Sequence, residues 1–206
     1  MNLAKSVGIG IACATAAAMG PIASAGPISG EFGPNLVTNG SFEATSVIAG
    51  SGWTVSGAFT GEGFDYFIDT NAADAQSGTH SFAGGAVGDL GFISQTITTN
   101  PGSHYNIDLW LANLSGFADG TEVQVRWAGN IVYSASDILG FGYREIVIDP
   151  VATSATTSLS IGLRDDSFFL NVDNISVRVV PEPATLALFL SGLGAVGFSR
   201  RNRRSM

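Results

Sequence analysis

Two short alternating segments of this chain carry the side chains best suited to binding chemistry. In residues 105–111 and 122–127, polar and apolar residues alternate, so each segment has a polar face. If the two segments are neighbouring strands of a hairpin, their polar faces combine one aromatic ring with amide and charged groups: Trp110, Asp108, Gln124 and Arg126. Proteins hold a pyranose in this way, with its apolar face stacked on the ring and its hydroxyls hydrogen bonded. The alternative is that Trp110 packs under the loop at residues 114–120.

Two acidic residues stand where the pattern favours apolar ones. Asp173 has the same parity as Ile175 and Val177 in an alternating segment, so we expect its carboxylate on the core side. Glu43 directly follows Phe42, which we expect in the core of the first strand. An isolated carboxylate in an apolar environment is costly, so it becomes protonated or finds a partner. The alternatives are that Asp173 caps a turn or pairs with an arginine, and that Glu43 faces water.

Catalytic motifs find little support in this sequence. The only two histidines, His80 and His104, are far apart in the chain, and there is no G-x-S-x-G, H-E-x-x-H or phosphate-binding glycine motif. Glycoside hydrolysis requires a pair of carboxylates, but the chain has so many acidic residues that some pair is inevitable. Such a pair is therefore no evidence for a glycosidase. We therefore predict that the protein is not an enzyme, with a glycan-active hydrolase as the outside alternative.

Short strands separated by turns must position these residues. Period-two alternation is typical of half-buried antiparallel strands, and no stretch of the body sustains a helical period. The expected strands lie near residues 53–55, 64–68, 80–83, 92–98, 105–111, 122–127, 131–134, 144–148, 159–163 and 174–179. Many short strands with frequent turns predict an all-β fold, a single antiparallel β-sandwich of the jelly-roll type at residues 35–180, after a flexible lead-in at 26–34.

The N-terminus has the three parts of a secretory signal peptide. Lys5 supplies a positive charge, residues 7–18 are apolar or small, and Ala23-Ser24-Ala25 is a cleavage site for signal peptidase, so residues 1–25 are excluded from the fold. Cys13 is the only cysteine and lies in this segment, so the mature domain has no thiol for disulfides or metal ligation. Residues 26–180 contain four arginines and sixteen acidic residues, an excess of about twelve negative charges. This charge disfavours binding to nucleic acid and favours binding of divalent cations.

The C-terminus is arranged as a membrane-sorting tail. Pro181, Glu182 and Pro183 precede an apolar run at 184–198, and four arginines follow: Arg200, Arg201, Arg203 and Arg204. As a helix the run spans roughly 22 Å, short of the roughly 30 Å hydrocarbon core, and snorkelling arginines with local thinning make up the difference. The arginines keep their flank cytoplasmic, which leaves the body outside. The alternative is a buried C-terminal helix of a soluble domain.

Residues 181–206 resemble the PEP-CTERM sorting tail, which has a Pro-Glu-Pro signature, a hydrophobic helix and a basic end in this order. The resemblance implies recognition by an exosortase, a membrane protease-transpeptidase that cleaves near the Pro-Glu-Pro element. It also implies a Gram-negative host that makes exopolysaccharide. We therefore expect an intermediate anchored in the inner membrane through its C-terminal helix, and then a place at the cell surface or in the extracellular matrix.

A second resemblance covers about residues 35–180. The segment Asn39-Gly-Ser-Phe-Glu43, the following Trp53, Gln95-Thr-Ile97 and the segment Asp173-Asn-Ile-Ser-Val177 are similar to galactose-binding-like jelly rolls, the fold of many carbohydrate-binding modules. The resemblance implies that the first and last strands come close, so that Glu43 and Asp173 meet. It also implies a structural Ca²⁺ there, since Ca²⁺ prefers carboxylate and carbonyl oxygens.

Together these patterns predict an exported, non-catalytic module that binds polysaccharide or builds extracellular matrix, with exopolysaccharide as its partner. The alternative is a structural surface or biofilm protein that has no small-molecule ligand.

Overall fold

A computed structural model of the chain describes residues 32–44, 48, 50–61 and 65–181. The predicted signal peptide, most of the predicted lead-in, the apolar run at 184–198 and the terminal arginines lie outside these residues. Among the helices of the described ranges, none has the length and apolar character that crossing a membrane requires.

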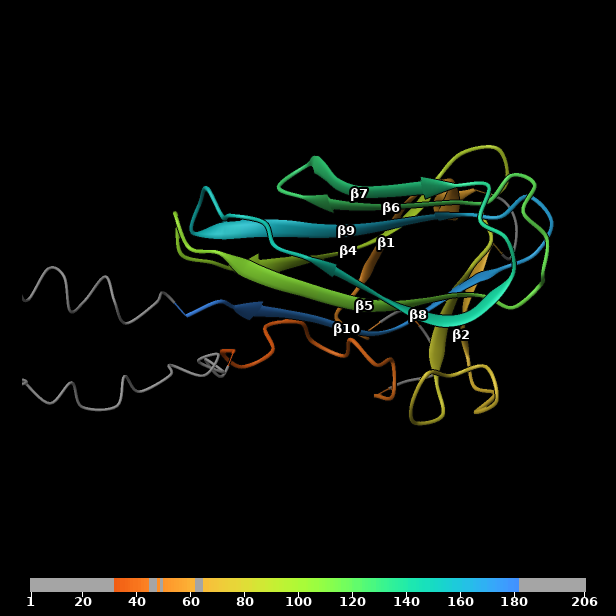
Figure 1. Ribbon diagram of the computed structural model, residues 1–206, viewed down its shortest axis with the longest axis horizontal. Coiled ribbons are helices and arrows are strands. Elements are labelled where there is room, and N and C mark those ends of the chain that lie inside the picture. The colour runs from red at the N-terminus through yellow and green to blue at the C-terminus, as the bar shows by residue number, and fades with distance from the viewer. Residues whose placement is uncertain (1–31, 45–47, 49, 62–64, 182–206) are drawn as a thin grey trace, which may run out of the picture.

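The described residues form a sandwich of two antiparallel five-stranded sheets (Figure 1). In spatial order the first sheet consists of β1 (Thr54–Gly57), β4 (Gly91–Thr98), β9 (Thr156–Arg164), β6 (Glu122–Trp127) and β7 (Asn130–Ser136). The second consists of β2 (Tyr66–Asp69), β3 (Ser81–Gly84), β10 (Leu170–Val179), β5 (Tyr105–Asn113) and β8 (Phe141–Ile148). A single turn of 3-10 helix, η1 (Ala58–Thr60), follows β1. The predicted all-β sandwich is confirmed.

Alternation along the strands explains how the two sheets enclose one core. In β5, every second residue from Tyr105 to Leu111 is buried, while the residues between them are partly exposed. The inward-facing residues of β4, β6, β9 and β10 also belong to this core. Examples that are fully shielded from solvent are Ile93 in β4, Val125 in β6, Ile161 in β9 and Val177 in β10. Side chains of the two inner faces thus interdigitate between the sheets, which is the packing that period-two patterns favour.

The hairpin between residues 105–111 and 122–127, on which the sugar-platform hypothesis depends, does not form. β5 pairs with β10 and β8 in the second sheet, whereas β6 pairs with β7 and β9 in the first. The connection at residues 114–121 therefore crosses between the sheets, and it is fixed by the Asn113 amide, which donates to the carbonyls of Phe117 (2.6 Å) and Ile138 (2.7 Å). Alternation shows that each segment is a strand with one buried face, but it does not specify the neighbouring strand.

The expected first strand around Phe42 is instead a series of turns. Phe42 has a positive φ of 58° and lies fully buried, with its ring 5.9 Å from Trp53 and 5.7 Å from Phe82. The prediction that Phe42 enters the core therefore holds for the side chain and fails for the backbone. A positive φ is unfavourable for a residue with a large side chain, so tertiary packing must stabilise this turn.

A β-bulge corrects the predicted direction of Asp173. The register of β10 against β5 shifts between Asp173 and Ser176, where Asn174 has a positive φ of 49°. The extra residue changes the parity, so Val172 and Ile175 both face the core while Asp173 lies on the other face. Asp173 is paired with Trp110, which also faces outward, yet it is fully buried because a loop covers it.

Candidate functional site

A polar pocket of about 480 Å³ lies on the outer face of the second sheet. Its floor consists of side chains from β5 and β10, and one wall is the irregular segment at residues 35–41, which runs beside β10 (Figure 1). The backbone holds this segment in place: Leu36 N–H donates to the Val177 carbonyl at 2.8 Å, and Ile175 N–H donates to the Gly40 carbonyl at 2.9 Å. The Asn35 amide oxygen also accepts from Val177 N–H at 3.0 Å.

Gly40 allows this wall to approach the sheet closely. A Cβ atom at this position would lie 1.9 Å from the Ile175 carbonyl oxygen, so any other residue would push the segment away from the bulge in β10. The close approach lets Asn39 and Ser41 line the pocket together with Asp108 and Trp110. The Asn39-Gly40 sequence therefore shapes the pocket through its backbone.

Trp110 differs from the other two tryptophans of the chain. Trp53 and Trp127 are buried in the core, and each donates its indole N–H to a backbone carbonyl at 3.1 Å. Trp110 is only half-buried and lines the pocket, and its indole N–H has no hydrogen-bond partner within the part of the chain that the structure describes. An aromatic face with a free donor is therefore presented at the surface.

Asp108 lies in the pocket beside groups of both charges. Its Oδ1 atom is buried without a hydrogen-bond partner among the described residues. Desolvation raises the pKa of Asp108 to about 6, and the charge and hydrogen bonding of Glu145 act in the same direction, while Arg178 opposes them. At neutral pH the carboxylate is thus ionised but poorly solvated. The Asn39 amide nitrogen is a second buried polar atom without a partner in the described ranges.

The structure brings together two of the four residues predicted to form a sugar platform. Asp108 and Trp110 share the pocket, but Gln124 and Arg126 lie on the outer face of the other sheet. There the Arg126 guanidinium bonds to the Gln124 amide oxygen at 2.5 Å and covers the Phe92 ring at 4.4 Å from its centre. These two side chains therefore satisfy each other away from the pocket.

The pocket residues that sequence reasoning missed come from β10 and from the segment at 35–41. Arg178 lines the pocket, and its alternation with the buried Val177 and the partly buried Val179 in an expected strand was a usable signal. Asn35, Asn39 and Ser41 gave no such signal, because an irregular segment has no periodicity from which a facing side can be read.

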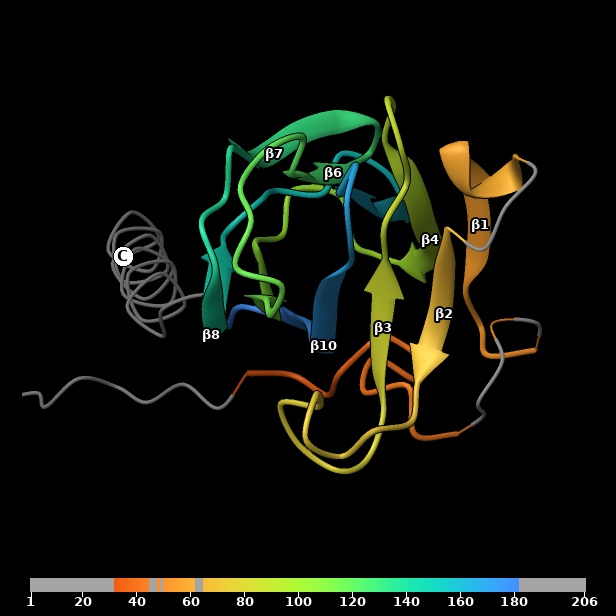
Figure 2. The ribbon, with the colours of Figure 1, turned by 90° about the vertical axis from the view of Figure 1, so that its right-hand side faces the viewer.

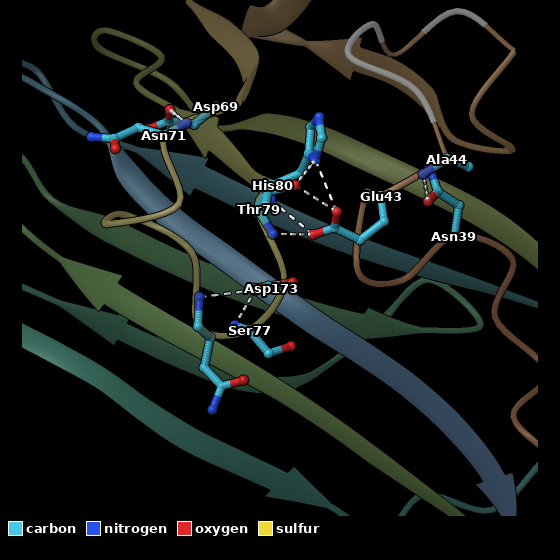
Figure 3. Close-up of polar contacts among 10 residues, drawn as sticks. Asn39, Glu43, Ala44, Asp69, Asn71, Ser77, Thr79, His80 and Asp173 are labelled. Atoms are coloured by element: carbon cyan, nitrogen blue, oxygen red, sulfur yellow. Dashed lines mark hydrogen bonds and ion pairs between the residues drawn. The ribbon is translucent and has the colours of Figure 1, made fainter.

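Glu43 and Asp173 hold the same loop, between β2 and β3, which lies next to the N-terminal segment (Figures 2 and 3). Asp173 Oδ2 accepts the backbone N–H groups of Gln76 (2.9 Å) and Ser77 (3.2 Å). Glu43 Oε1 accepts those of Thr79 (2.7 Å) and His80 (2.8 Å). The two carboxylates thus bind different parts of the same loop, and together they anchor residues 76–80.

The lone pairs of these carboxylates are largely occupied by protein donors. Glu43 Oε2 also accepts from the Thr79 hydroxyl and interacts with His80 Nδ1, both at 2.9 Å, and Asp173 Oδ1 accepts from Asn174 N–H at 2.6 Å. Desolvation alone would raise the pKa of Glu43, but the bonds from Thr79 and His80 outweigh it and lower this pKa to about 2. Within the described residues, no group of three His, Cys, Asp or Glu side chains is placed to hold a metal.

A fit to calcium is therefore incomplete in this arrangement. Carboxylate oxygens are suitable ligands, but a cation between Glu43 and Asp173 would have to replace some of the bonds to residues 76–80. Burial raises the pKa of Asp173, the backbone donors lower it, and the nearby charge of Glu43 raises it further, so the pair has a repulsion that either a cation or a proton would relieve.

Comparison with known proteins identifies the C-terminal tail. Residues 179–204 match the PEP-CTERM protein-sorting motif. This chain carries a PEP-CTERM sorting motif. The motif marks an exported protein, and it starts at the last residue of β10, so it follows the sandwich directly. No curated protein sequence matches the chain.

Solved structures share the fold of the sandwich. TmCBM61 in complex with beta-1,4-galactotriose matches at 14% identity and a TM-score of 0.52, over 70% of this chain and 97% of its own. The CBM22-1 xylan-binding domain of Xyn10C from Paenibacillus barcinonensis matches at 14% identity and a TM-score of 0.50, over 74% and 98%. The enzymatically active domain of bacteriophage CBA120 tailspike protein 4 matches at 17% identity and 0.53, over 71% of this chain but 21% of its own. Carbohydrate-binding modules are thus among the structural neighbours.

Several loops gather at the end of the sandwich that lies away from the C-terminal end of β10 (Figure 1), and they expose apolar side chains. The loops at this end contact one another, since Gly88 N–H donates to Asp166 Oδ1 at 2.9 Å. Their exposed residues are Val87, Leu114, Phe117, Leu139 and Phe168. Phe117 and Phe168 stack nearly parallel, with ring centres 5.2 Å apart. This apolar end is distinct from the polar pocket and suits contact with another macromolecule.

Proposed function

We propose that this chain is an exported, non-catalytic carbohydrate-binding protein, and that the pocket between residues 35–41, β5 and β10 holds the glycan. The observation that carries the proposal is Trp110, whose half-buried ring and unpaired indole N–H lie beside Asp108, Asn39 and Arg178. The similarity of the fold to carbohydrate-binding modules supports the proposal without identifying the ligand.

The chemistry of the pocket matches the two faces of a pyranose. One apolar face of the sugar would lie on Trp110, while its hydroxyls would bond to Asp108, Arg178 and the Asn39 amide. Asn39 Nδ2 and Asp108 Oδ1 are buried and lack partners within the described chain, so a rotation of either side chain toward the sugar would break no existing bond of that atom. A shallow site of this kind binds each sugar weakly and gains avidity from repeated units.

Binding to a glycan array and retention on polysaccharide affinity gels test this function. We expect the purified protein to be retained by at least one neutral polysaccharide and to migrate freely in a gel without polysaccharide. A blank array at high protein concentration would contradict the proposal. It would favour the structural alternative, a surface or matrix protein without a small ligand, for which the apolar end formed by Phe117, Phe168 and their neighbours would supply the contacts.

Catalysis is not part of the proposal, although 21% of a tailspike enzyme domain matches the fold. Among the described residues that line the pocket, Asp108 is the one acid, and Glu145 belongs to the neighbouring strand β8. Glycoside hydrolysis requires two carboxyl groups that face each other across the sugar at about 5 to 9.5 Å. A single lining carboxylate therefore suits binding better than general acid and base roles.

A structural Ca²⁺ at Glu43 and Asp173 is a separate proposal, and thermal unfolding with a chelator tests it. If the ion is bound, the chelator lowers the melting temperature, and Asp173→Asn removes that sensitivity. If the carboxylates act only through the loop N–H groups, the melting curve does not move, because all of those donors belong to the protein. An unchanged curve would therefore contradict the calcium site.

Processing at the membrane is proposed to follow the sorting motif. A signal peptidase would remove residues 1–25, and an exosortase-type enzyme would act near Pro181-Glu182-Pro183. The body would then be placed at the cell surface or in an exopolysaccharide matrix, where a glycan-binding pocket has its ligand at high local concentration.

A further inference from the structure

The charges around the pocket are unbalanced toward the negative. Among the described residues, Arg178 is the one basic residue that lines it, and Asp108 from β5 is the one acid. A second carboxylate, that of Glu145 in β8, lies next to the pocket, because Glu145 pairs with Trp110 and its charge raises the pKa of Asp108. The wall at residues 35–41 contributes no charged side chain. A neutral sugar would leave this excess in place, and an acidic sugar would add to it.

Asp108 is the member of the pair that needs a partner. Its Oδ1 atom is buried and accepts no hydrogen bond within the described chain. Leaving a buried, ionised oxygen unsatisfied is costly, and an ammonium group relieves that cost best because it offers three donors together with a positive charge. The raised pKa of Asp108, about 6, is consistent with a carboxylate that lacks such a partner.

The strand register places the pair next to the aromatic ring. Trp110 is directly opposite Glu145 in the pairing of β5 with β8, and Asp108 is two residues from Trp110 on the same face of β5. A sugar ring stacked on Trp110 would therefore have its substituents beside both carboxylates. An amino group on such a ring would reach Asp108, the acid that lines the pocket, while the ring keeps its stacking contact.

We propose that this pocket prefers glycans with free amino groups, that is, polymers of 2-amino-2-deoxy sugars that lack the N-acetyl group. The preference rests on the proposed carbohydrate-binding function of the same pocket and adds the class of sugar. The N-acetylated form loses the positive charge and carries a bulkier substituent, so it would bind like a neutral sugar. Uronic acids would be rejected by Asp108 and Glu145.

Isothermal titration of the purified full-length chain with three β-1,4-linked tetrasaccharides tests the preference: those of glucosamine, N-acetylglucosamine and glucose. At about neutral pH, we expect the glucosamine tetramer to bind at least about tenfold more tightly than the glucose tetramer, since one charge-assisted hydrogen bond contributes roughly 1.5 kcal/mol or more. The Asp108→Asn variant should bind both tetramers alike, because its side chain keeps its shape and loses its charge.

A matched variant distinguishes binding in the pocket from non-specific attraction of a cationic glycan to a negatively charged protein. Asp119→Asn removes the same charge from an exposed loop between β5 and β6, away from the pocket, and should keep the full preference. Equal binding of the glucosamine and glucose tetramers by the native chain would overturn the amino-sugar preference and leave the carbohydrate-binding proposal standing. A preference that survives Asp108→Asn, or that falls equally with Asp119→Asn, would also overturn it. Failure of all three tetramers to bind would overturn the amino-sugar preference, whereas the carbohydrate-binding proposal itself is decided by the glycan array.

Discussion

Trp110→Ala should abolish retention of the protein on any polysaccharide gel that retains the native chain. Trp110 supplies the only aromatic ring that lines the polar pocket, and its indole N–H is unpaired within the described residues. Truncating an aromatic residue at the centre of a binding site costs about 2 kcal/mol or more, which corresponds to a roughly thirtyfold loss of affinity. For a site that binds weakly, such a loss removes measurable retention.

The chain itself supplies the control for this experiment. Arg126→Ala removes an outward residue from the opposite sheet, where the guanidinium contacts Gln124 and Phe92, so retention should not change. Trp110→Phe keeps a smaller aromatic face and should retain part of the binding. Because Trp110 is half-buried outside the core, the melting temperature of each variant should remain near that of the native protein. Unchanged retention of a folded Trp110→Ala variant would exclude this pocket.

Asp173→Ala should lower the free energy of unfolding by about 3 kcal/mol. The fully buried carboxylate accepts hydrogen bonds from the backbone of Gln76, Ser77 and Asn174, and alanine can accept none of them. The loop at residues 76–80 would then be held by Glu43 and by the Asn174 side-chain amide, which donates to Gln76 and Ser77. For a domain of this size the loss corresponds to a fall in melting temperature of roughly 10 °C.

Urea unfolding measures this effect, and hydrogen exchange locates it. The amides of Gln76 and Ser77 should exchange faster in the variant, because their acceptor is lost. Asp119→Ala serves as the matched control: it removes an exposed aspartate, and we expect a change within about 0.5 kcal/mol. If Asp173→Ala unfolds at the same urea concentration as the native protein, the carboxylate does not anchor the loop.

The bulge in β10 shows why Asp173 was assigned to the wrong face. Its parity with Ile175 and Val177 is real in the sequence, but the extra residue at Asn174 reverses the face on which it lies. No period-two pattern encodes a bulge, because the pattern on each side of it remains regular. The expectation that Asp173 is buried and needs partners was nevertheless confirmed, since burial followed from the loop above it rather than from the core.

The sequence by itself determined the strands, the sandwich and the sorting motif. Alternation is a local property of each segment, so the segments at 105–111 and 122–127 were recognisable as strands without knowledge of their neighbours. The tail was recognisable because its Pro-Glu-Pro, apolar and arginine parts are contiguous in the chain.

Only the tertiary structure decided which residues share a surface. Trp110 and Arg126 have equivalent positions in two alternating strands, yet those strands lie in opposite sheets, and the partners of Trp110 come from β10 and from residues 35–41. Strand pairing depends on how loops cross the sandwich and on contacts between residues far apart in the chain. The local pattern of polar and apolar residues specifies neither of these. The polar pocket therefore could not be predicted from the sequence, because residues 35–41 and β10, which are far apart in the chain, form it together with β5.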